Sequence, residues 1–153
     1  MAHDDRSRPE LTVVGTGFLV AGQVTPEARS ARVAADKLFF LVSDPSTRVW
    51  LEGLSPSAES LYDAYAEGRP RDESYREMVE RILAPLAAGQ SVCVALYGHP
   101  GVFVQPSHEA IRRARAAGWE ARMLPAISAE DCLYADLVPA SLPCRSSGAV
   151  HDR

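Results

Sequence analysis

Short runs of apolar residues alternate along this chain with segments whose apolar positions recur at helical spacing. The runs at residues 11–15, 37–42, 91–97 and 119–124 predict buried β-strands. Between them lie segments that carry the start and stop signals of helices. Strand, helix and strand thus follow one another repeatedly, and this order predicts an α/β fold with a mainly parallel sheet flanked by helices.

The most regular helical pattern starts at Asp72 and ends before Gly89. Six of its side chains are spaced to form a single apolar face: Tyr75, Met78, Val79, Ile82, Leu83 and Leu86. Shorter helices are predicted at residues 26–35, 45–51 and 107–117. The first two have Thr25-Pro26 and Asp44-Pro45 at their starts, in which a capping side chain precedes a proline at the first helical position.

A last helix is expected from residue 129 to about Leu137, opened by Ser128 and Asp131 as a capping box. Residues 55–71 lack periodicity and predict an extended loop with a short strand near residues 60–62. Long loops in compact domains are often functional. Residues 1–10 are polar and are expected to be disordered, and residues 138–153 are expected to form an irregular tail.

Length and charge narrow the class of protein. A chain of 153 residues is long enough for one domain with a substantial core. The net charge of -4 argues against wholesale nucleic-acid binding, and Arg112, Arg113 and Arg115 are interpreted as a solvated helix face. No segment approaches about 18 consecutive apolar residues, so no membrane span is predicted and a cytoplasmic protein is expected.

The cysteines and histidines form no metal-ligand grouping. Cys93, Cys132 and Cys144 share no CxxC spacing, so they are interpreted as free thiols. His99 could act as a base or a metal ligand, but no second ligand stands near it, which favours hydrogen bonding to a ligand or to the backbone. His108 is expected on the surface of a first helical turn.

The turn at residues 98–103, GHPGVF, follows a predicted strand and precedes a predicted helix. Open α/β sheets bind ligands at such turns, where glycine allows close approach and Phe103 could form an aromatic wall. A tight connection without a ligand is the alternative. A second such turn, Gly15-Thr16-Gly17, starts like a dinucleotide fingerprint, but Val20 occupies the third glycine position. A standard nicotinamide or flavin site is therefore rejected.

Three phenols and a guanidinium crowd into fourteen positions of the chain, at Tyr62, Tyr65, Arg71 and Tyr75. Such a group can position an amide or an anion, and a deprotonated tyrosine could remove a weakly acidic proton. The ordinary phenol pKa near 10 makes that task demanding. In the alternative interpretation Tyr75 packs in the core and the other side chains cover a loop.

Three segments in this order resemble the tetrapyrrole methylase superfamily: residues 14–17 (VGTG), 97–103 (YGHPGVF) and 124–131 (LPAISAED). Members of that superfamily are S-adenosylmethionine-dependent methyltransferases with two α/β domains. The resemblance covers residues 11–137, the first domain, and within the superfamily it is closest to the borosin-type peptide backbone N-methyltransferases. Ala126 departs from the pattern, because it replaces a glycine and its Cβ is expected to strain the turn.

The resemblance implies roles for particular residues. The S-adenosylmethionine site would be formed by Gly15, Gly17, Tyr97, Gly98, His99, Pro100, Val102, Phe103, Ser128 and Ala129. Tyr62, Tyr65, Arg71 and Tyr75 would surround the peptide bond. Methyl transfer to the backbone nitrogen would then use Arg71 and a tyrosine to stabilise charge on the carbonyl oxygen, and Tyr75 as the base.

The resemblance also implies partners. The acceptor would be a peptide, or alternatively a tetrapyrrole or another small molecule. The second domain is expected to be missing, so the chain would be truncated and inactive alone unless a homodimer or another partner completes it. A non-catalytic binding module that retains the fold is the third interpretation.

Overall fold

A five-stranded parallel sheet forms the centre of the molecule, in a computed structural model that describes residues 9–102 and 104–137. The strand order is β3-β2-β4-β1-β5, and every pairing is parallel. The strands are β1 (Glu10–Gly15), β2 (Lys37–Leu41), β3 (Glu59–Ser60), β4 (Val92–Leu96) and β5 (Glu120–Met123). The predicted α/β class and its parallel sheet are confirmed.

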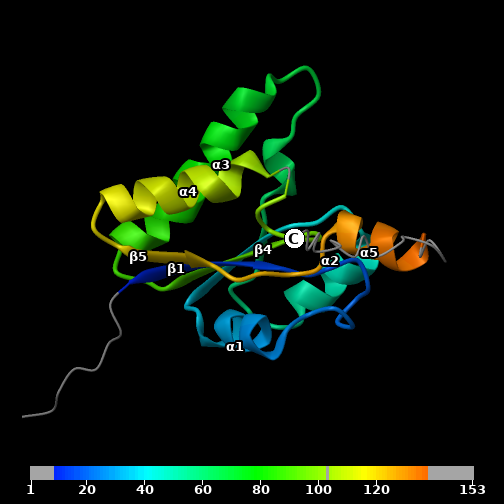
Figure 1. Ribbon diagram of the computed structural model, residues 1–153. Coiled ribbons are helices and arrows are strands. Elements are labelled where there is room, and N and C mark those ends of the chain that lie inside the picture. Colours follow the sequence, from blue (N-terminus) through cyan, green and yellow to red (C-terminus); the bar gives the residue numbers. More distant parts are fainter. Residues whose placement is uncertain (1–8, 103, 138–153) are drawn as a thin grey trace, which may run out of the picture.

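Helices cover both faces of the sheet (Figure 1). They are α1 (Pro26–Ala34), α2 (Pro45–Glu52), α3 (Arg71–Ala87), α4 (Gln105–Ala116) and α5 (Ala129–Asp136), with a short 3-10 helix η1 (Tyr62–Ala64). α1 and α2 lie on one face, α3 and α4 lie on the other, and α5 stands beyond one end of the strands. None of the helices in these two described stretches has the length and hydrophobicity needed to cross a membrane.

The central strand β4 shows why the sheet is buried on both sides. All five of its residues are buried. Val92, Val94 and Leu96 pack with the apolar face of α3 and with α4, whereas Cys93 and Ala95 pack with α1 and α2. Successive side chains point to opposite faces of a strand, so a strand covered on both faces is a continuous apolar run.

Helix α4 begins two residues earlier than the sequence predicted. It starts at Gln105 with Pro106 in its first turn, where proline is tolerated because the first amides of a helix have no partner within it. Ser107 is buried, and its hydroxyl lies 2.7 Å from the carbonyl oxygen of Pro100 and 2.8 Å from that of Val104. Ser107 thus joins the helix to the preceding loop instead of capping it.

Candidate functional site

The carboxyl ends of β1 and β4 form a topological switch point. These two strands are neighbours, but the chain leaves β1 for α1 on one face and leaves β4 for α4 on the other face (Figure 1). Ligands of open α/β sheets bind in the crevice that such a divergence opens. Both glycine turns singled out in the sequence lie here.

Hydrogen bonds join the two turns to each other. The amide of Gly17 donates to the carbonyl of Gly98 (3.3 Å), and the amide of Gly98 donates to the carbonyl of Gly17 (3.1 Å). The amide of Thr16 donates to the carbonyl of Leu96 (2.8 Å). Gly17 and Gly98 have φ of 64° and 68°, a conformation that favours glycine. The turns therefore form one rigid backbone unit.

A third turn meets this unit at Gly15. A Cβ at Gly15 would lie 2.2 Å from the carbonyl oxygen of Gly98, 2.4 Å from the Cβ of Ala126 and 2.9 Å from the Cδ of Pro100. The loops after β4 and β5 thus pack directly against the Cα of Gly15, at the end of β1, where only a hydrogen atom takes the place of a side chain. The strain expected at Ala126 is not found, because Ala21 (φ 57°) is the one non-glycine residue of the described chain with positive φ. That prediction was wrong: Ala126 fits against Gly15 in an ordinary backbone conformation.

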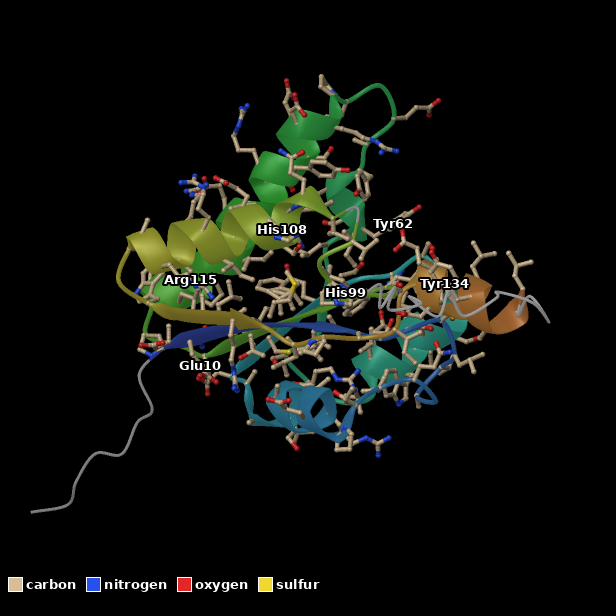
Figure 2. The ribbon with its side chains drawn as sticks, in the orientation of Figure 1. Glu10, Tyr62, His99, His108, Arg115 and Tyr134 are labelled. Carbon is tan, nitrogen blue, oxygen red and sulfur yellow. The ribbon has the colours of Figure 1, made fainter. Side chains whose placement is uncertain are left out.

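His99 stabilises its own loop. Its Nδ1 accepts a hydrogen bond from the amide of Gly101 (3.0 Å), so the neutral ring carries its proton on Nε2, which is left to donate to a ligand. Figure 2 shows His99 near the carboxyl end of the sheet. His108 is exposed as expected, and its Nε2 lies 2.9 Å from the carbonyl oxygen of Gly101. Among the described residues no group of histidine, cysteine and acidic side chains could hold a metal ion.

The sequence did not reveal the side chains that hydrogen-bond to the backbone of the loops after β1 and β4. Gln23 accepts hydrogen bonds through its Oε1 from the amides of Phe18 (2.7 Å) and Leu19 (3.3 Å). Ser107 and His108 donate instead to carbonyl groups of the loop after β4, those of Pro100 and Gly101. The one available signal was Ser107, a polar residue spaced i, i+3, i+4 and i+7 with Ala110, Ile111 and Ala114 on a buried helix face.

Ser128 is engaged in the predicted capping box. Its hydroxyl accepts from the amide of Asp131 (3.2 Å), and its own amide donates to the carboxylate of Asp131 (2.7 Å). The hydroxyl of Ser128 also donates to that carboxylate (2.8 Å), and the hydrogen bonds from the amide and then from the hydroxyl of Ser128 hold the pKa of Asp131 below its ordinary value. Ala129 is the first residue of α5 and is exposed. The site prediction for Phe103 lies outside the described residues.

Edge-on contacts join the three tyrosines. The ring centroids of Tyr62 and Tyr65 are 5.6 Å apart, and those of Tyr65 and Tyr75 are 6.2 Å apart. Burial, followed by the neighbouring Tyr75, raises the pKa of Tyr65 to about 12, and the charge of Arg71 acts in the opposite direction. Tyr65 therefore stays protonated at neutral pH. Tyr75 is partly buried and also packs against the core, so the two interpretations of this residue are compatible.

The tyrosines lie at the same edge of the sheet as the glycine turns. Tyr62 follows β3, which is parallel to the other strands, and Tyr75 lies in the first turns of α3, which returns from that edge to β4. Figure 2 shows Tyr62 and His99 on this side of the molecule. Tyr97, 39% exposed, directly follows β4 and contacts Phe18 edge-on, with ring centroids 4.9 Å apart.

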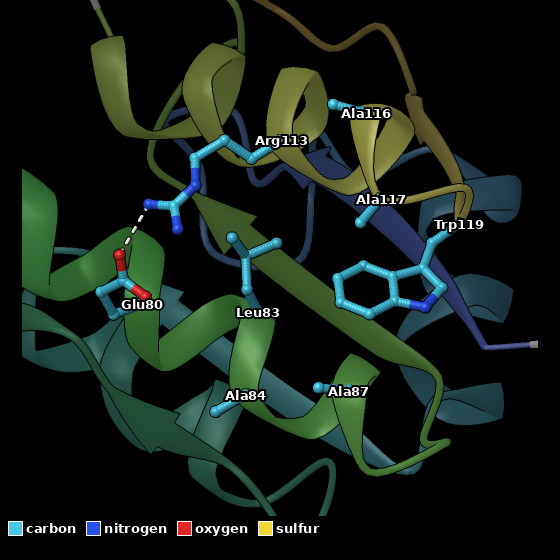
Figure 3. A pocket seen from close by; sticks show the side chains of 8 residues that line it. All are labelled: Glu80, Leu83, Ala84, Ala87, Arg113, Ala116, Ala117 and Trp119. Carbon is cyan, nitrogen blue, oxygen red and sulfur yellow. Dashed lines mark hydrogen bonds and ion pairs between the residues drawn. The ribbon is translucent and has the colours of Figure 1, made fainter.

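Several hollows lie along the described part of the chain, and one of about 240 Å³ between α3 and the start of α4 is lined by Tyr75. A hollow of about 420 Å³ opens between residues 22–25 and 125–127, and Ala126 lines it. A groove of about 540 Å³ runs between α3 and α4, with alanines along it, Trp119 at one end and the ion pair of Glu80 and Arg113 (2.7 Å) at the other (Figure 3). It contains none of the predicted site residues, because it lies toward the opposite end of α3.

Comparisons with known proteins identify what the chain is similar to. Residues 10–141 match the family model of Tetrapyrrole (Corrin/Porphyrin) Methylases. A "Methyltransferase/ribosomally synthesized cyclic peptide dendrothelin A precursor" of Dendrothele bispora is 44% identical over 138 residues, which are 90% of this chain and 33% of that protein. A "type I borosin cyclic peptide precursor" of Coprinopsis marcescibilis is 41% identical over 128 residues, 84% of this chain and 33% of that protein.

The fold comparison agrees with the sequence comparison. A crystal structure of diphthine synthase superposes with a TM-score of 0.58 at 16% identity, over 82% of this chain and 47% of that one. This likeness concerns the fold alone. The chain spans about a third of the length of the two curated relatives above.

Proposed function

Because the chain belongs to the tetrapyrrole methylase family, we propose that it binds S-adenosylmethionine and takes part in methylating the backbone amides of a peptide. The observation that carries this proposal is the common position of two groups of residues. The phenol cluster of Tyr62, Tyr65 and Tyr75 lies at the same sheet edge as the glycine turns of the switch point. A methyl donor and an amide acceptor need to meet at such a place.

The glycine turns have the chemistry that the cofactor requires. At Gly15, Gly17 and Gly98 a side chain would collide with atoms of the neighbouring loops, so these glycines allow the turns to pack closely and fix the shape of the crevice. The Nε2 of His99 is a hydrogen-bond donor, and Tyr97 and Phe18 offer aromatic surface for an adenine ring. We assign to this site the residues Gly15, Gly17, Tyr97, Gly98, His99, Pro100, Val102, Phe103, Ser128 and Ala129.

An amide nitrogen is a weak nucleophile, so the site has to activate it for methyl transfer. When bound, the cofactor supplies an electrophilic methyl group on its sulfonium sulfur. The amide nitrogen forms a bond to this carbon as the carbon–sulfur bond breaks, and the amide proton has to leave. In our proposal Tyr75 reacts as its phenolate and becomes a phenol on taking this proton, whereas Arg71 and the protonated Tyr65 stabilise the charge that develops on the carbonyl oxygen.

The proposal also includes a second protein chain that packs on α5. None of the residues of α5 is buried: Leu133 and Tyr134 are 53% and 76% exposed, and Leu137, which follows the helix, is 63% exposed. An isolated helix of eight residues is not stable in water, so α5 needs a partner surface. We propose that a second copy of the chain, or another chain that supplies a second domain, covers this helix and completes the cofactor site.

Calorimetric titration of the full chain with S-adenosylhomocysteine tests the cofactor site, with the mass in solution recorded in parallel. We expect saturable binding that Gly98→Ala abolishes, because its new Cβ would lie 2.8 Å from the ring of Phe18. Gly53→Ala is the matched control, since its Cβ would meet only ordinary contacts at 3.5 Å. A folded protein that does not bind the ligand, either as an assembled form of this chain or after a partner chain is added, would contradict the proposal.

The acceptor is tested separately. Incubation with S-adenosylmethionine and synthetic peptides should add methyl groups to backbone nitrogens, located by fragmentation in a mass spectrometer. Methylation of a tetrapyrrole in preference to every peptide would assign the site to the other acceptor class. Transfer that appears only after a partner chain is added would support the proposed second protein chain.

A further inference from the structure

Ion pairs centred on Arg81 hold the tyrosine-bearing loop on α3. The Nη2 atom of Arg81 lies 2.6 Å from a carboxylate oxygen of Glu59 and donates to the carbonyl of Ser60 (3.0 Å). Its Nη1 lies 2.9 Å from a carboxylate oxygen of Asp63. One guanidinium thus connects α3 to β3 and to η1, the two short elements on either side of Leu61. Arginine suits this task because its five donors form a planar fork.

A second arginine closes the other end of the same loop. Arg69 binds the carboxylate of Glu77 and donates to the carbonyl of Ala64 (3.4 Å). Glu77 also lies 3.7 Å from Arg81, so the two arginines share one carboxylate. Glu73, Glu77 and Arg81 are spaced by four residues and therefore form one stripe along α3. This stripe faces the loop from residue 61 to residue 70.

Little else fixes this loop. β3 is two residues long and pairs with β2 alone, and only Leu61 and Ala64 of the loop are buried. Gly68 has φ of 75° and no neighbour within 4 Å of its Cβ position. Tyr62 and Tyr65 are 50% and 38% exposed. The side chain of Arg81, by contrast, is 22% exposed, so it is better shielded than its carboxylate partners.

We propose that Arg81 is a positioning residue for the phenol cluster: by binding Glu59, Ser60 and Asp63 it fixes Tyr62 and Tyr65 against Tyr75 on the same helix. This inference rests on the proposed function, because the positioned phenols are those assigned to the acceptor site. Arg81 itself is not among the residues assigned to the methyl donor or to the acceptor. Its effect must therefore pass through the orientation of the tyrosines.

Arg81→Met and Arg81→Lys test the inference, with Arg48→Met as the matched control. Arg48 pairs only with Glu52 on its own helix, on the opposite face of the sheet. In Arg81→Met we expect kcat for peptide methylation to fall about tenfold, because small misplacement of reacting groups is costly. Affinity for S-adenosylhomocysteine should stay within about twofold. Arg81→Lys should recover part of the rate, and Arg48→Met should match the parent protein.

A double-mutant cycle separates positioning from general stabilisation. In a Tyr65→Phe background Arg81→Met should lower kcat for peptide methylation much less than in the parent protein. The effects of two substitutions are not additive when one residue acts through the other. Full additivity would overturn the inference, as would an Arg81→Met enzyme with unchanged kcat. Asp63→Asn, at an exposed position, gives a milder version of the same test if Arg81→Met does not fold.

The restraint of the loop by Arg81 can also be tested without measuring methylation. Glutamyl endopeptidase should cut after the exposed Glu67 faster in Arg81→Met than in the parent and in Arg48→Met. If Arg81→Met is cleaved faster but the parent chain does not methylate peptides, the restraint of the loop by Arg81 is supported and the proposed function is contradicted. Equal cleavage rates would overturn the restraint itself.

Discussion

Replacing Gly15 by alanine gives a direct test of how tightly the three strand-end turns are packed. The added Cβ would lie 2.2 Å from the carbonyl oxygen of Gly98, 2.4 Å from the Cβ of Ala126 and 2.9 Å from the Cδ of Pro100. All three atoms belong to backbone or to short rigid side chains. No rotamer change relieves the contacts, so the turns themselves must move apart.

The energetic effect follows from these contacts. Overpacking a rigid interior costs about 1–3 kcal/mol, and three simultaneous close contacts place Gly15→Ala near the upper end, about 3 kcal/mol. For a domain of this size that corresponds to a melting temperature lower by about 6–12 °C. Affinity for S-adenosylhomocysteine should fall as well, because the displaced turns are the ones assigned to the cofactor.

Urea unfolding of the full chain measures this change, with Gly22→Ala as the control. A Cβ at Gly22 would meet its nearest neighbour, the Cβ of Leu19, at 3.4 Å, an ordinary contact. The control should remain within about 0.5 kcal/mol of the parent. Equal stability of Gly15→Ala and Gly22→Ala would refute the inference that the three turns meet at Gly15.

Three further predictions concern single side chains. Tyr75→Phe should lower peptide methylation at least about a hundredfold with unchanged S-adenosylhomocysteine binding, as general bases contribute about 10²–10⁴-fold; an unchanged rate would rule out Tyr75 as the base. Arg32 is fully buried, and neither of its Nη atoms has a hydrogen-bond partner among the described residues. Its Nε donates to the carbonyl of Ala28 (3.1 Å) and its guanidinium lies over the ring of Trp50, but no carboxylate of the described residues pairs with it. Replacing it by methionine should leave stability in urea equal or higher, since a buried charge without an opposite charge is costly, and a clear loss would contradict this. The hydrogen bond from Lys37 and then that from Arg81 lower the pKa of Glu59 below its ordinary 4.5, so its contribution to stability is present above pH 4.5 and is lost as pH falls below it through the folded-state pKa. Glu59→Gln should therefore flatten the dependence of the unfolding free energy on pH in that acidic range, and an unaltered profile would argue against the ion pairs.

The sheet and its helices could be predicted because their signals are local. Apolar runs correspond to β1, β2, β4 and β5, and the capping residues Thr25, Asp44 and Ser128 all cap helices as expected. The start of α4 was predicted two residues late, because the helix begins before Pro106, which sits in its first turn. The hydroxyl of Ser107, predicted as the first helical residue, reaches back to Pro100 instead.

The packing of the site could not be predicted, because it depends on strand register. Gly15, Gly98 and Ala126 lie far apart in the chain and meet only through the pairing of β1 with both β4 and β5. The ion pairs of Arg81 were missed for a similar reason. On a helix its charge resembles that of any solvated arginine until the loop from β3 folds against it.

The central position of β4 affects the order in which the chain can fold. β1 and β2 are both hydrogen-bonded to β4, with Leu11 opposite Val92 and Lys37 opposite the same residue, and they are not paired with each other. Such distant pairings close large loops and slow folding. A nascent chain therefore exposes the apolar strands β1 and β2 until β4 leaves the ribosome, and a fragment that ends before residue 92 keeps only the two-residue pairing of β2 with β3.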